Sequence, residues 1–273
     1  MKLYRYDMKK FFAIAVIACL QGCATPQHLN RQAPIAVDPY TTAKLDDIFS
    51  RAQAKPTTQV IAPGVEEISS ALMDTPYQAD TLIGSVTVPE QLVVDLRHLD
   101  CFTFIDNVEA LRRSSNNQEY IKQLIKVRYA QGKVDFSHRR HFFTDWAQDR
   151  DAQAQDVTSD LGSVTKIVEK DLNIKADGTP FIPGLSGVSR RIAYIPGPVF
   201  NSETIKNIKD GDYIGVYSDL PGLDVSHVGV FIRTANGPVF RNASSRSMNR
   251  KVVDYPFVEF VAKVPGIVVL RPR

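Results

Sequence analysis

The sequence predicts an α+β fold in which helices come first and an antiparallel sheet follows. Residues 41–130 contain segments with apolar side chains at three- and four-residue spacing, which is typical of amphipathic helices. Residues 211–270 contain short apolar runs separated by turn residues, which is typical of antiparallel strands. About 250 residues remain beyond an N-terminal targeting segment, enough for one sizeable core.

The early helices have recognisable capping residues. Thr41 or Thr42 can cap the first helix, and Asp100 can cap the third. Apolar side chains at 105, 108 and 111 would form the buried stripe of that third helix. The expected helices span residues 41–53, 65–73, 101–113 and 119–130, and a short strand is expected over 91–96.

The second half of the chain is richer in strands. The middle, from about 133 to 200, is irregular with two expected strands. Gly211 and Asp212 mark a turn into the next strand, and a further turn is expected over 234–237. The expected strands cover 163–169, 187–195, 213–217, 225–233, 239–242 and 267–270, with one last helix over 256–264.

The N-terminus has the pattern of a lipoprotein signal. A cationic start precedes an apolar run over 11–20, which is too short to span a bilayer. The run ends in Leu-Gln-Gly before Cys23, the form of a lipoprotein signal-peptidase site, so we expect residues 1–22 to be removed and Cys23 to be lipidated. The alternative is a buried N-terminal helix. Residues 23–40 would be a lipidated tether, because they are polar and contain three prolines.

Removal of the signal changes the charge. The chain has 33 basic and 30 acidic residues, and cleavage would leave 29 of each. The mature charge would be zero, so the composition favours no nucleic-acid partner. Residue 24 is Ala rather than Asp, which by analogy with lipoprotein sorting places the anchor in the outer membrane and the protein on its periplasmic face.

Cys101 would be the one unmodified thiol of the mature chain, because Cys19 is lost with the signal and the Cys23 sulfur is acylated. An unpaired cysteine in an oxidising compartment is either buried or chemically active. Its expected place in the first turn of a helix would favour the thiolate and lower its pKa. Cys101 is therefore a candidate nucleophile, with a buried structural cysteine as the alternative.

His227 is the candidate base. Strand alternation places Val225, His227, Gly229 and Phe231 on one face, and the glycine leaves room for another group. A nucleophilic cysteine needs such a base within hydrogen-bond reach. Asn242 is a candidate third residue that would fix the imidazole tautomer. A structural histidine and ordinary turn chemistry for Asn242 are the alternatives.

The hairpin register bears on this pair. A two-residue turn at Asn236-Gly237 would place Asn242 opposite Phe231, four residues from His227 and too far for a side-chain hydrogen bond. We therefore predict that His227 pairs directly with Asn242, which puts the turn centre between Thr234 and Ala235.

With these residues in place, the chain resembles the NlpC/P60 superfamily of papain-like cell-wall hydrolases. Asp100-Cys101 resembles its nucleophile motif, His227-Val228-Gly229 its histidine strand, and Asn242-Ala243-Ser244 its H-A-S element. Residues 74–77 resemble its G-x-P-Y element, with Asp74 in place of glycine. Residues 100–107 and 139–146 resemble two motifs of the branch called DUF1460, and the likeness spans about residues 65–250.

The resemblance implies a papain-like catalytic domain over 41–273, with the nucleophile at a helix N-terminus packed on an antiparallel sheet. It also implies cleavage of the N-acetylmuramoyl–L-alanine bond of peptidoglycan fragments through a thioester on Cys101. Tyr77 and the Cys101 backbone N–H would hold the oxyanion. Arg140, His141, Trp146 and Ser226 would contact the substrate, with the indole face of Trp146 suited to a sugar ring; a core tryptophan is the alternative. No cofactor is implied.

Three other functions remain open on the sequence. Related branches cut between D-Glu and a diamino acid. A non-catalytic lipoprotein that binds peptidoglycan or a partner would keep the scaffold without the reaction. A metal enzyme is disfavoured, because only His138 and His141 have a spacing close to that of zinc ligands.

Overall fold

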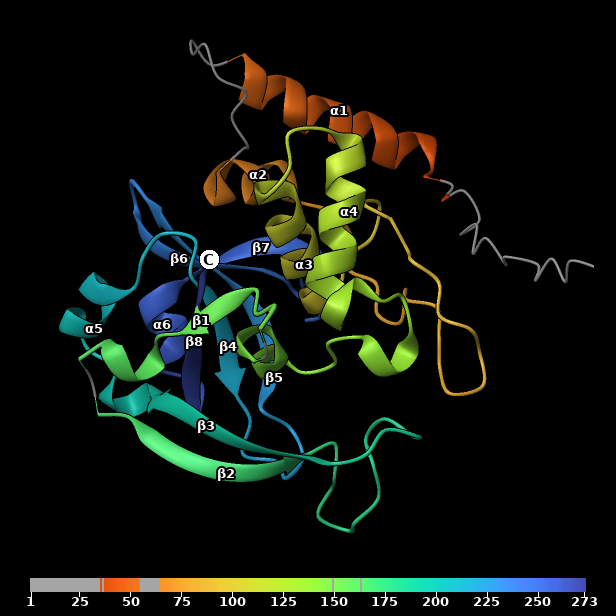
Figure 1. Ribbon diagram of the computed structural model, residues 1–273. Coiled ribbons are helices and arrows are strands. Elements are labelled where there is room, and N and C mark those ends of the chain that lie inside the picture. The colour runs from red at the N-terminus through yellow and green to blue at the C-terminus, as the bar shows by residue number, and fades with distance from the viewer. Residues whose placement is uncertain (1–34, 36, 55–63, 149, 163) are drawn as a thin grey trace, which may run out of the picture. The chain divides into compact units, whose positions relative to one another are not determined.

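An antiparallel sheet of eight strands forms the centre of the part of the chain that the computed structural model describes, residues 35, 37–54, 64–148, 150–162 and 164–273 (Figure 1). The strands are β1 Ala154–Asp156, β2 Lys166–Leu172, β3 Val188–Pro196, β4 Tyr213–Tyr217, β5 Val225–Thr234, β6 Gly237–Ala243, β7 Val252–Pro256 and β8 Gly266–Pro272. Their order is β2-β3-β8-β4-β5-β6-β7, and β1 pairs with β8. The last strand of the chain therefore lies between β3 and β4, which ties the C-terminus into the middle of the sheet.

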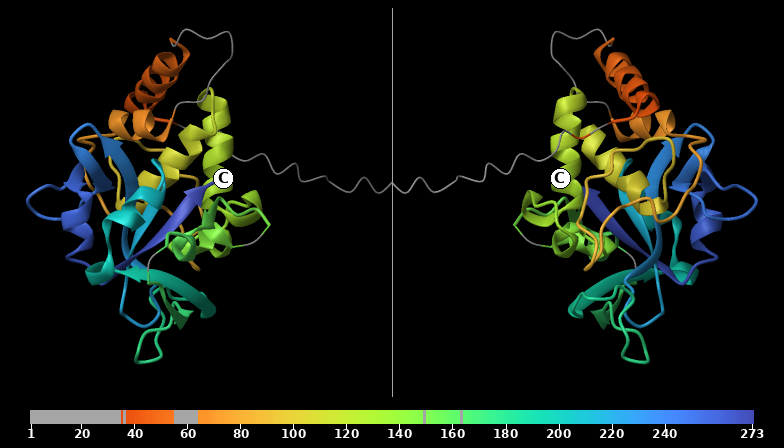
Figure 2. Two further views of the ribbon diagram at one scale, coloured as in Figure 1. Left: turned by 90° about the vertical axis from the view of Figure 1, so that its left-hand side faces the viewer. Right: turned by 90° about the vertical axis from the view of Figure 1, so that its right-hand side faces the viewer.

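Among the described residues, four helices precede the sheet, and two short ones lie within the strand-rich half. They are α1 Pro39–Gln53, α2 Val65–Ala71, α3 Cys101–Arg112, α4 Asn117–Arg128, α5 Ser202–Asn207 and α6 Phe257–Val261. Short 3-10 turns include η2 Phe136–His138 and η3 Phe143–Ala147. In Figures 1 and 2 the helices α1 to α4 lie together at one end, and the β2–β3 ribbon extends at the other. Helix α3 packs on β5 and β6, which places its first turn against the histidine strand.

Both faces of the sheet are buried, since alternate residues of the central strands enter two different clusters. Val228, Val230 and Ile232 of β5 pack with the helices α1 to α4 in the first cluster. Phe231 of β5 and Phe240 of β6 pack with α6 in the second. The strand alternation of β5 was therefore predicted correctly, and the face that carries His227 is buried as well.

Most predicted elements are present, but several bounds differ, and the strands β1 and β7 and the helix α5 were not predicted. Residues 91–96 form no regular strand, because the Leu96 N–H donates to the Thr41 hydroxyl and the Val93 carbonyl accepts from Arg128 instead of from a neighbouring strand. Strand β7 was not predicted, because the segment 252–256 is short and ends in proline. Pro256 ends this strand and caps α6 rather than beginning a long helix.

The folded unit begins earlier than predicted. It starts at Ile35, and Ile35 and Val37 pack against the first cluster. Asp38, not Thr41 or Thr42, caps α1, because its carboxylate accepts from the Thr41 N–H and Pro39 fits the first helical turn. The expected tether over 23–40 therefore includes several residues that belong to the folded unit. The signal segment and Cys23 lie outside the described residues. Within the described ranges, no helix is both long and apolar enough to cross a bilayer.

Candidate active site

Cys101 is the first residue of α3, as predicted. The Asp100 carboxylate accepts from the Thr103 N–H at 2.7 Å, and the Asp100 N–H donates to the Thr103 hydroxyl at 2.9 Å. This reciprocal capping box fixes the start of the helix. Cys101 as a residue is neither fully buried nor fully exposed.

The prediction that the helix start lowers the thiol pKa is wrong. Burial raises the pKa of Cys101 to about 12, and the neighbouring Asp100 charge adds to the rise. Backbone N–H groups of Val228, Cys101 and Phe102 favour the thiolate, but they do not offset these effects. The residue that caps the helix is thus itself an anion beside the sulfur. The thiol is neutral at pH 7.

Asn242 sets the tautomer of His227. The Asn242 amide nitrogen donates to the Phe240 carbonyl at 3.2 Å, which turns its oxygen toward the imidazole. That oxygen lies 2.9 Å from Nε2 of His227. An amide oxygen only accepts, so Nε2 carries the proton and Nδ1 is left as an unprotonated acceptor. Burial lowers the pKa of His227, and the Arg246 cation adds to that effect, so the ring is neutral at pH 7.

The hydrogen bond forms in a different register from the one predicted. Val230 pairs with Arg241 and Thr234 with Gly237, which places Asn242 opposite Gly229 rather than opposite His227. The two side chains meet diagonally on one face, a contact that long side chains can make across a strand pair. The glycine between them is required. A Cβ at Gly229 would lie 2.5 Å from the Arg241 carbonyl oxygen and 2.6 Å from the Phe240 ring.

Cys101 and His227 line one cavity of about 150 Å³. Its walls are mainly apolar and include Phe102, Phe142, Phe143, Phe181, Ile182 and Leu223. The Val228 N–H approaches the cysteine sulfur, which places the sulfur directly beside the histidine strand. The predicted nucleophile and base therefore meet in one cavity, although they are separated by more than a hundred residues.

Tyr77 lies next to the start of α3. Its N–H donates to the Arg250 carbonyl at 2.8 Å, and it forms a parallel bridge with Leu99. Burial raises the pKa of Tyr77, and the nearby Cys101 and Asp100 add to the rise. The hydroxyl therefore stays protonated and able to donate. The substitution of Asp74 for glycine preserves the turn before it, since Asp74 adopts φ 64°, a conformation that aspartate tolerates better than most residues.

Comparison with known proteins assigns the family. The sequence model described as AmiA-like, N-acetylmuramoyl-L-alanine amidase-like, matches residues 67–267. The chain belongs to the AmiA-like family. The match runs from within α2 to the first residues of β8 and includes both Cys101 and His227. No curated protein is significantly similar to the AmiA-like chain.

Solved structures share this fold. An N-acetylmuramoyl-L-alanine amidase from Bacteroides uniformis is 28% identical, with a TM-score of 0.60 over 75% of this chain and 97% of that one. A Bacteroides fragilis protein provisionally named a xylanase is 26% identical, with a TM-score of 0.60 over 74% of this chain and 98% of that one. A Legionella pneumophila protein assigned to DUF1460 is 21% identical, with a TM-score of 0.64 over 85% of this chain and 97% of that one, which shows the fold alone.

Two other residues predicted for this AmiA-like site line its cavities. His141 lines the Cys101 cavity, and its Nε2 donates to the Phe136 carbonyl at 2.8 Å, which leaves Nδ1 as an acceptor. Burial lowers the pKa of His141, so this ring is neutral as well. Ser226 lies at a β-bulge between β4 and β5 and lines the cavities on both sides of His227. Both residues thus lie at the walls of these cavities.

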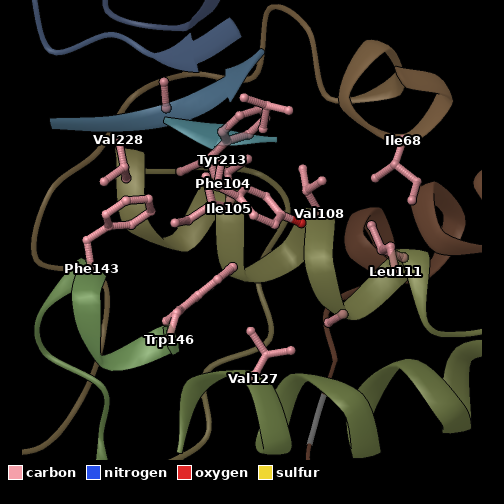
Figure 3. Packing of buried hydrophobic residues seen from close by; sticks show 14 of the residues in the cluster. Ile68, Phe104, Ile105, Val108, Leu111, Val127, Phe143, Trp146, Tyr213 and Val228 are labelled. Atoms are coloured by element: carbon pink, nitrogen blue, oxygen red, sulfur yellow. The ribbon is translucent and has the colours of Figure 1, made fainter. Parts of the chain in front are cut away.

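Trp146 and Arg140 do not lie there, and their prediction as substrate contacts is wrong. Trp146 is fully buried, with Tyr213 and Phe102 edge-on at ring-centroid distances of 5.0 and 6.4 Å. Figure 3 shows its ring pointing into the cluster beneath α3. Arg140 is also buried. Its guanidinium binds the last carbonyls of α4, those of Lys126 and Val127, and the Asp151 carboxylate.

Two residues of the site were missed from the sequence. Buried Asp224 accepts from the N–H and hydroxyl of Thr144 and from the Val225 N–H, so it ties η3 to the start of β5. It positions the histidine strand. Arg246 lines the cavity on the far side of His227. Its one signal in the sequence is a positive charge four residues beyond Asn242. Within the described ranges, no group of three or more His, Cys, Asp or Glu side chains is arranged to hold a metal ion.

Proposed function

We propose that the protein is a cysteine amidohydrolase of peptidoglycan fragments that cleaves the bond between N-acetylmuramic acid and L-alanine. The observation that carries this proposal is the hydrogen bond from His227 Nε2 to Asn242, because it leaves Nδ1 as a base in the cavity that holds Cys101. Membership of the AmiA-like family supports a peptidoglycan-type substrate.

The reaction begins from a neutral pair. Nδ1 of His227 takes the thiol proton as the Cys101 sulfur attacks the lactyl carbonyl, so no preformed thiolate is needed. The Cys101 N–H and the Tyr77 hydroxyl donate to the developing oxyanion. The imidazolium then gives its proton to the leaving alanine nitrogen, and the C–N bond breaks to leave a thioester on Cys101. Water, deprotonated by His227, hydrolyses the thioester and restores the thiol.

Product analysis tests the bond that is cut. A muramoyl tetrapeptide should yield free N-acetylmuramic acid and an intact tetrapeptide, identified by mass. Release of a muramoyl dipeptide would instead show D-Glu–diamino acid endopeptidase activity, which uses the same chemistry. Unchanged substrate with the wild-type chain would overturn both and favour a non-catalytic binding protein.

Glycoside hydrolysis is less compatible with this site. That reaction ordinarily needs two carboxyl groups on either side of the scissile bond. Among the residues that line the two cavities beside His227, Asp224 is the one carboxylate, and its oxygens are occupied by Thr144 and Val225. The name xylanase of one structural neighbour therefore finds no matching pair of acids here.

The proposal includes the place of action. Lipidation at Cys23 would hold the enzyme at the periplasmic face of the outer membrane, where muropeptides are available. Two or more acyl chains give a stable anchor. In cells of a diderm host, the wild-type chain should fractionate with outer membranes and C23A should not. Equal fractionation of the two chains would contradict the anchor.

A further inference from the structure

The loop between β2 and β3 supplies part of the wall of the cavity that contains Cys101. It runs over residues 173–187 and projects beyond the ends of both strands in Figure 1. Phe181 and Ile182 of this loop line the cavity. Every residue from 174 to 187 is exposed or half-buried, so the loop has no core of its own. A segment of this kind keeps one conformation only where specific contacts fix its backbone.

Asn173, the first residue of the loop, supplies such contacts and is fully buried. Its side-chain oxygen accepts from the Ile182 N–H at 2.7 Å. Its amide nitrogen donates to the carbonyls of Ile182 and Leu185 at 3.1 and 2.8 Å, and its own carbonyl accepts from the Phe181 N–H at 2.8 Å. Asn173 adopts φ 75°, a conformation that asparagine tolerates better than most residues. One buried residue thus fixes the backbone at both cavity-lining positions of the loop.

The same residue holds the loop between β4 and β5. The Asn173 N–H donates to the Gly222 carbonyl at 2.8 Å. Gly222 lies directly against the backbone of Ile174, where a Cβ would collide with the carbonyl oxygen. The residue after Gly222 again lines the Cys101 cavity. The three cavity-lining residues of the two loops are called the apolar wall, and they are Phe181, Ile182 and Leu223. Asn173 lies behind this wall and does not line the cavity itself.

We propose that Asn173 is a positioning residue for substrate binding, which it serves by holding the apolar wall in place. This inference rests on the proposed amidase function. A substrate that the Cys101 sulfur attacks has to enter this cavity, so groups beside the scissile bond meet the wall whichever half of the substrate faces it. Apolar groups gain free energy by burial there. A wall that is already ordered costs less on binding than one that the substrate has to order. Asn173 therefore sets affinity, while Cys101 and His227 set the chemistry.

A comparison of KM with kcat tests this role. Glycine accepts the backbone conformation of residue 173 but lacks the side-chain hydrogen bonds. On a muramoyl tetrapeptide, N173G should raise KM about five- to twentyfold and leave kcat within about twofold of the wild type. D177A is the matched control, because exposed Asp177 accepts from the N–H and hydroxyl of Thr179 in the same loop and does not line the cavity. Unchanged KM in N173G, or an equal rise of KM in D177A, would overturn the proposal.

A variant of the wall itself provides a test that does not depend on the folding of N173G. Phe181 and Ile182 are half-buried, so F181A/I182A removes the wall side chains without opening the core. This variant should raise KM by a similar factor. Adding N173G to it should change KM by less than about twofold, because the side chains through which Asn173 acts are already absent. A wild-type KM in F181A/I182A, or increases in KM that multiply, would contradict the proposal.

A binding measurement separates this proposal from the reaction. N-acetylmuramoyl-L-Ala-D-Glu is titrated into the inactive full-length C101A chain, into C101A/N173G and into C101A/D177A. Weaker binding to C101A/N173G alone supports the positioning role even if the wild-type chain does not cleave this compound, in which case only the amidase function fails. Equal binding to the three chains, or binding to none of them, would reject the positioning role. If the wild-type chain nevertheless cleaves the compound, the amidase function stands without it.

Discussion

His227 Nε2 donates to Asn242 Oδ1 at 2.9 Å, and Asn242 is held in that orientation by its own bond to the Phe240 carbonyl. The asparagine therefore decides which imidazole nitrogen faces the cysteine. In the proposed reaction, its oxygen would also stabilise the imidazolium that forms when His227 accepts the thiol proton. The proposed function therefore depends on an uncharged residue that lies opposite Gly229, two residues along β5 from His227.

Replacing Asn242 with alanine should lower kcat/KM about 10- to 100-fold. A hydrogen bond to a charged group contributes about 1.5–3 kcal/mol, and here that charge exists only during the reaction. The loss should appear mainly in kcat, since substrate binding does not use this bond. Steady-state kinetics of N242A measures this loss. N242Q should behave in the same way, because its longer side chain places the amide oxygen out of position for the bond to His227. Unchanged kcat in N242A would remove Asn242 from the mechanism.

The Cys101 thiol should stay protonated across the physiological range. Its pKa is raised to about 12, so the difference in thiolate absorbance between wild type and C101S should show no step between about pH 5 and 9. A step near neutral pH would mean a preformed thiolate–imidazolium pair. The acidic limb of kcat/KM should instead follow His227. Because burial lowers its pKa below 6.5, activity should rise with pH and reach half its maximum below pH 6.5.

Tyr77→Phe should reduce kcat about 100-fold or more with little change in KM. Loss of one oxyanion donor ordinarily removes about 3–4 kcal/mol of transition-state stabilisation. The backbone contacts of Tyr77 to Arg250 and Leu99 do not involve the hydroxyl, so the fold should be unaffected. Equal melting temperatures of Y77F and the wild type would confirm that the fold is unaffected. A kcat within threefold of wild type would assign the oxyanion to other donors.

Stability should depend on the buried ion pair between Arg128 and Asp106. Their side chains are 3% and 2% exposed, and Nε lies 2.8 Å from Oδ2. R128M leaves a buried carboxylate unpaired and should lower the free energy of unfolding by about 3–5 kcal/mol. The control is R51M, which breaks the exposed ion pair with Asp47. It should change the free energy of unfolding by less than about 1 kcal/mol. Similar effects of the two substitutions in urea denaturation would contradict this difference.

Local sequence signals predicted the elements that carry the site. The cap at Asp100, the alternation around His227 and the turn residues near 211 and 236 each depend on a few neighbouring residues, and each was correct in the structure. The resemblance in motif order brought Cys101, His227 and Asn242 together. Caps, strand alternation and turns are properties that short segments determine by themselves.

Properties that depend on distant neighbours were not predictable in this way. Trp146 is buried because α3 and β4 cover it, which the aromatic motif around it does not reveal. The thiol pKa depends on how deeply the helix start is buried, and burial outweighs the helix dipole. The hairpin register follows from the pairing of Thr234 with Gly237, which differs by two residues along β5 from the register that direct pairing of His227 and Asn242 required.

The central claim is that Cys101 and His227 act as one unit, and a double-mutant cycle in kcat tests it most directly. C101A, H227A and the double variant are assayed on a muramoyl tetrapeptide, with product masses as the readout. The account predicts that each single substitution removes nearly all activity and that the double variant is no slower than either single one. Substantial turnover by C101A, or losses that multiply in the double variant, would contradict it.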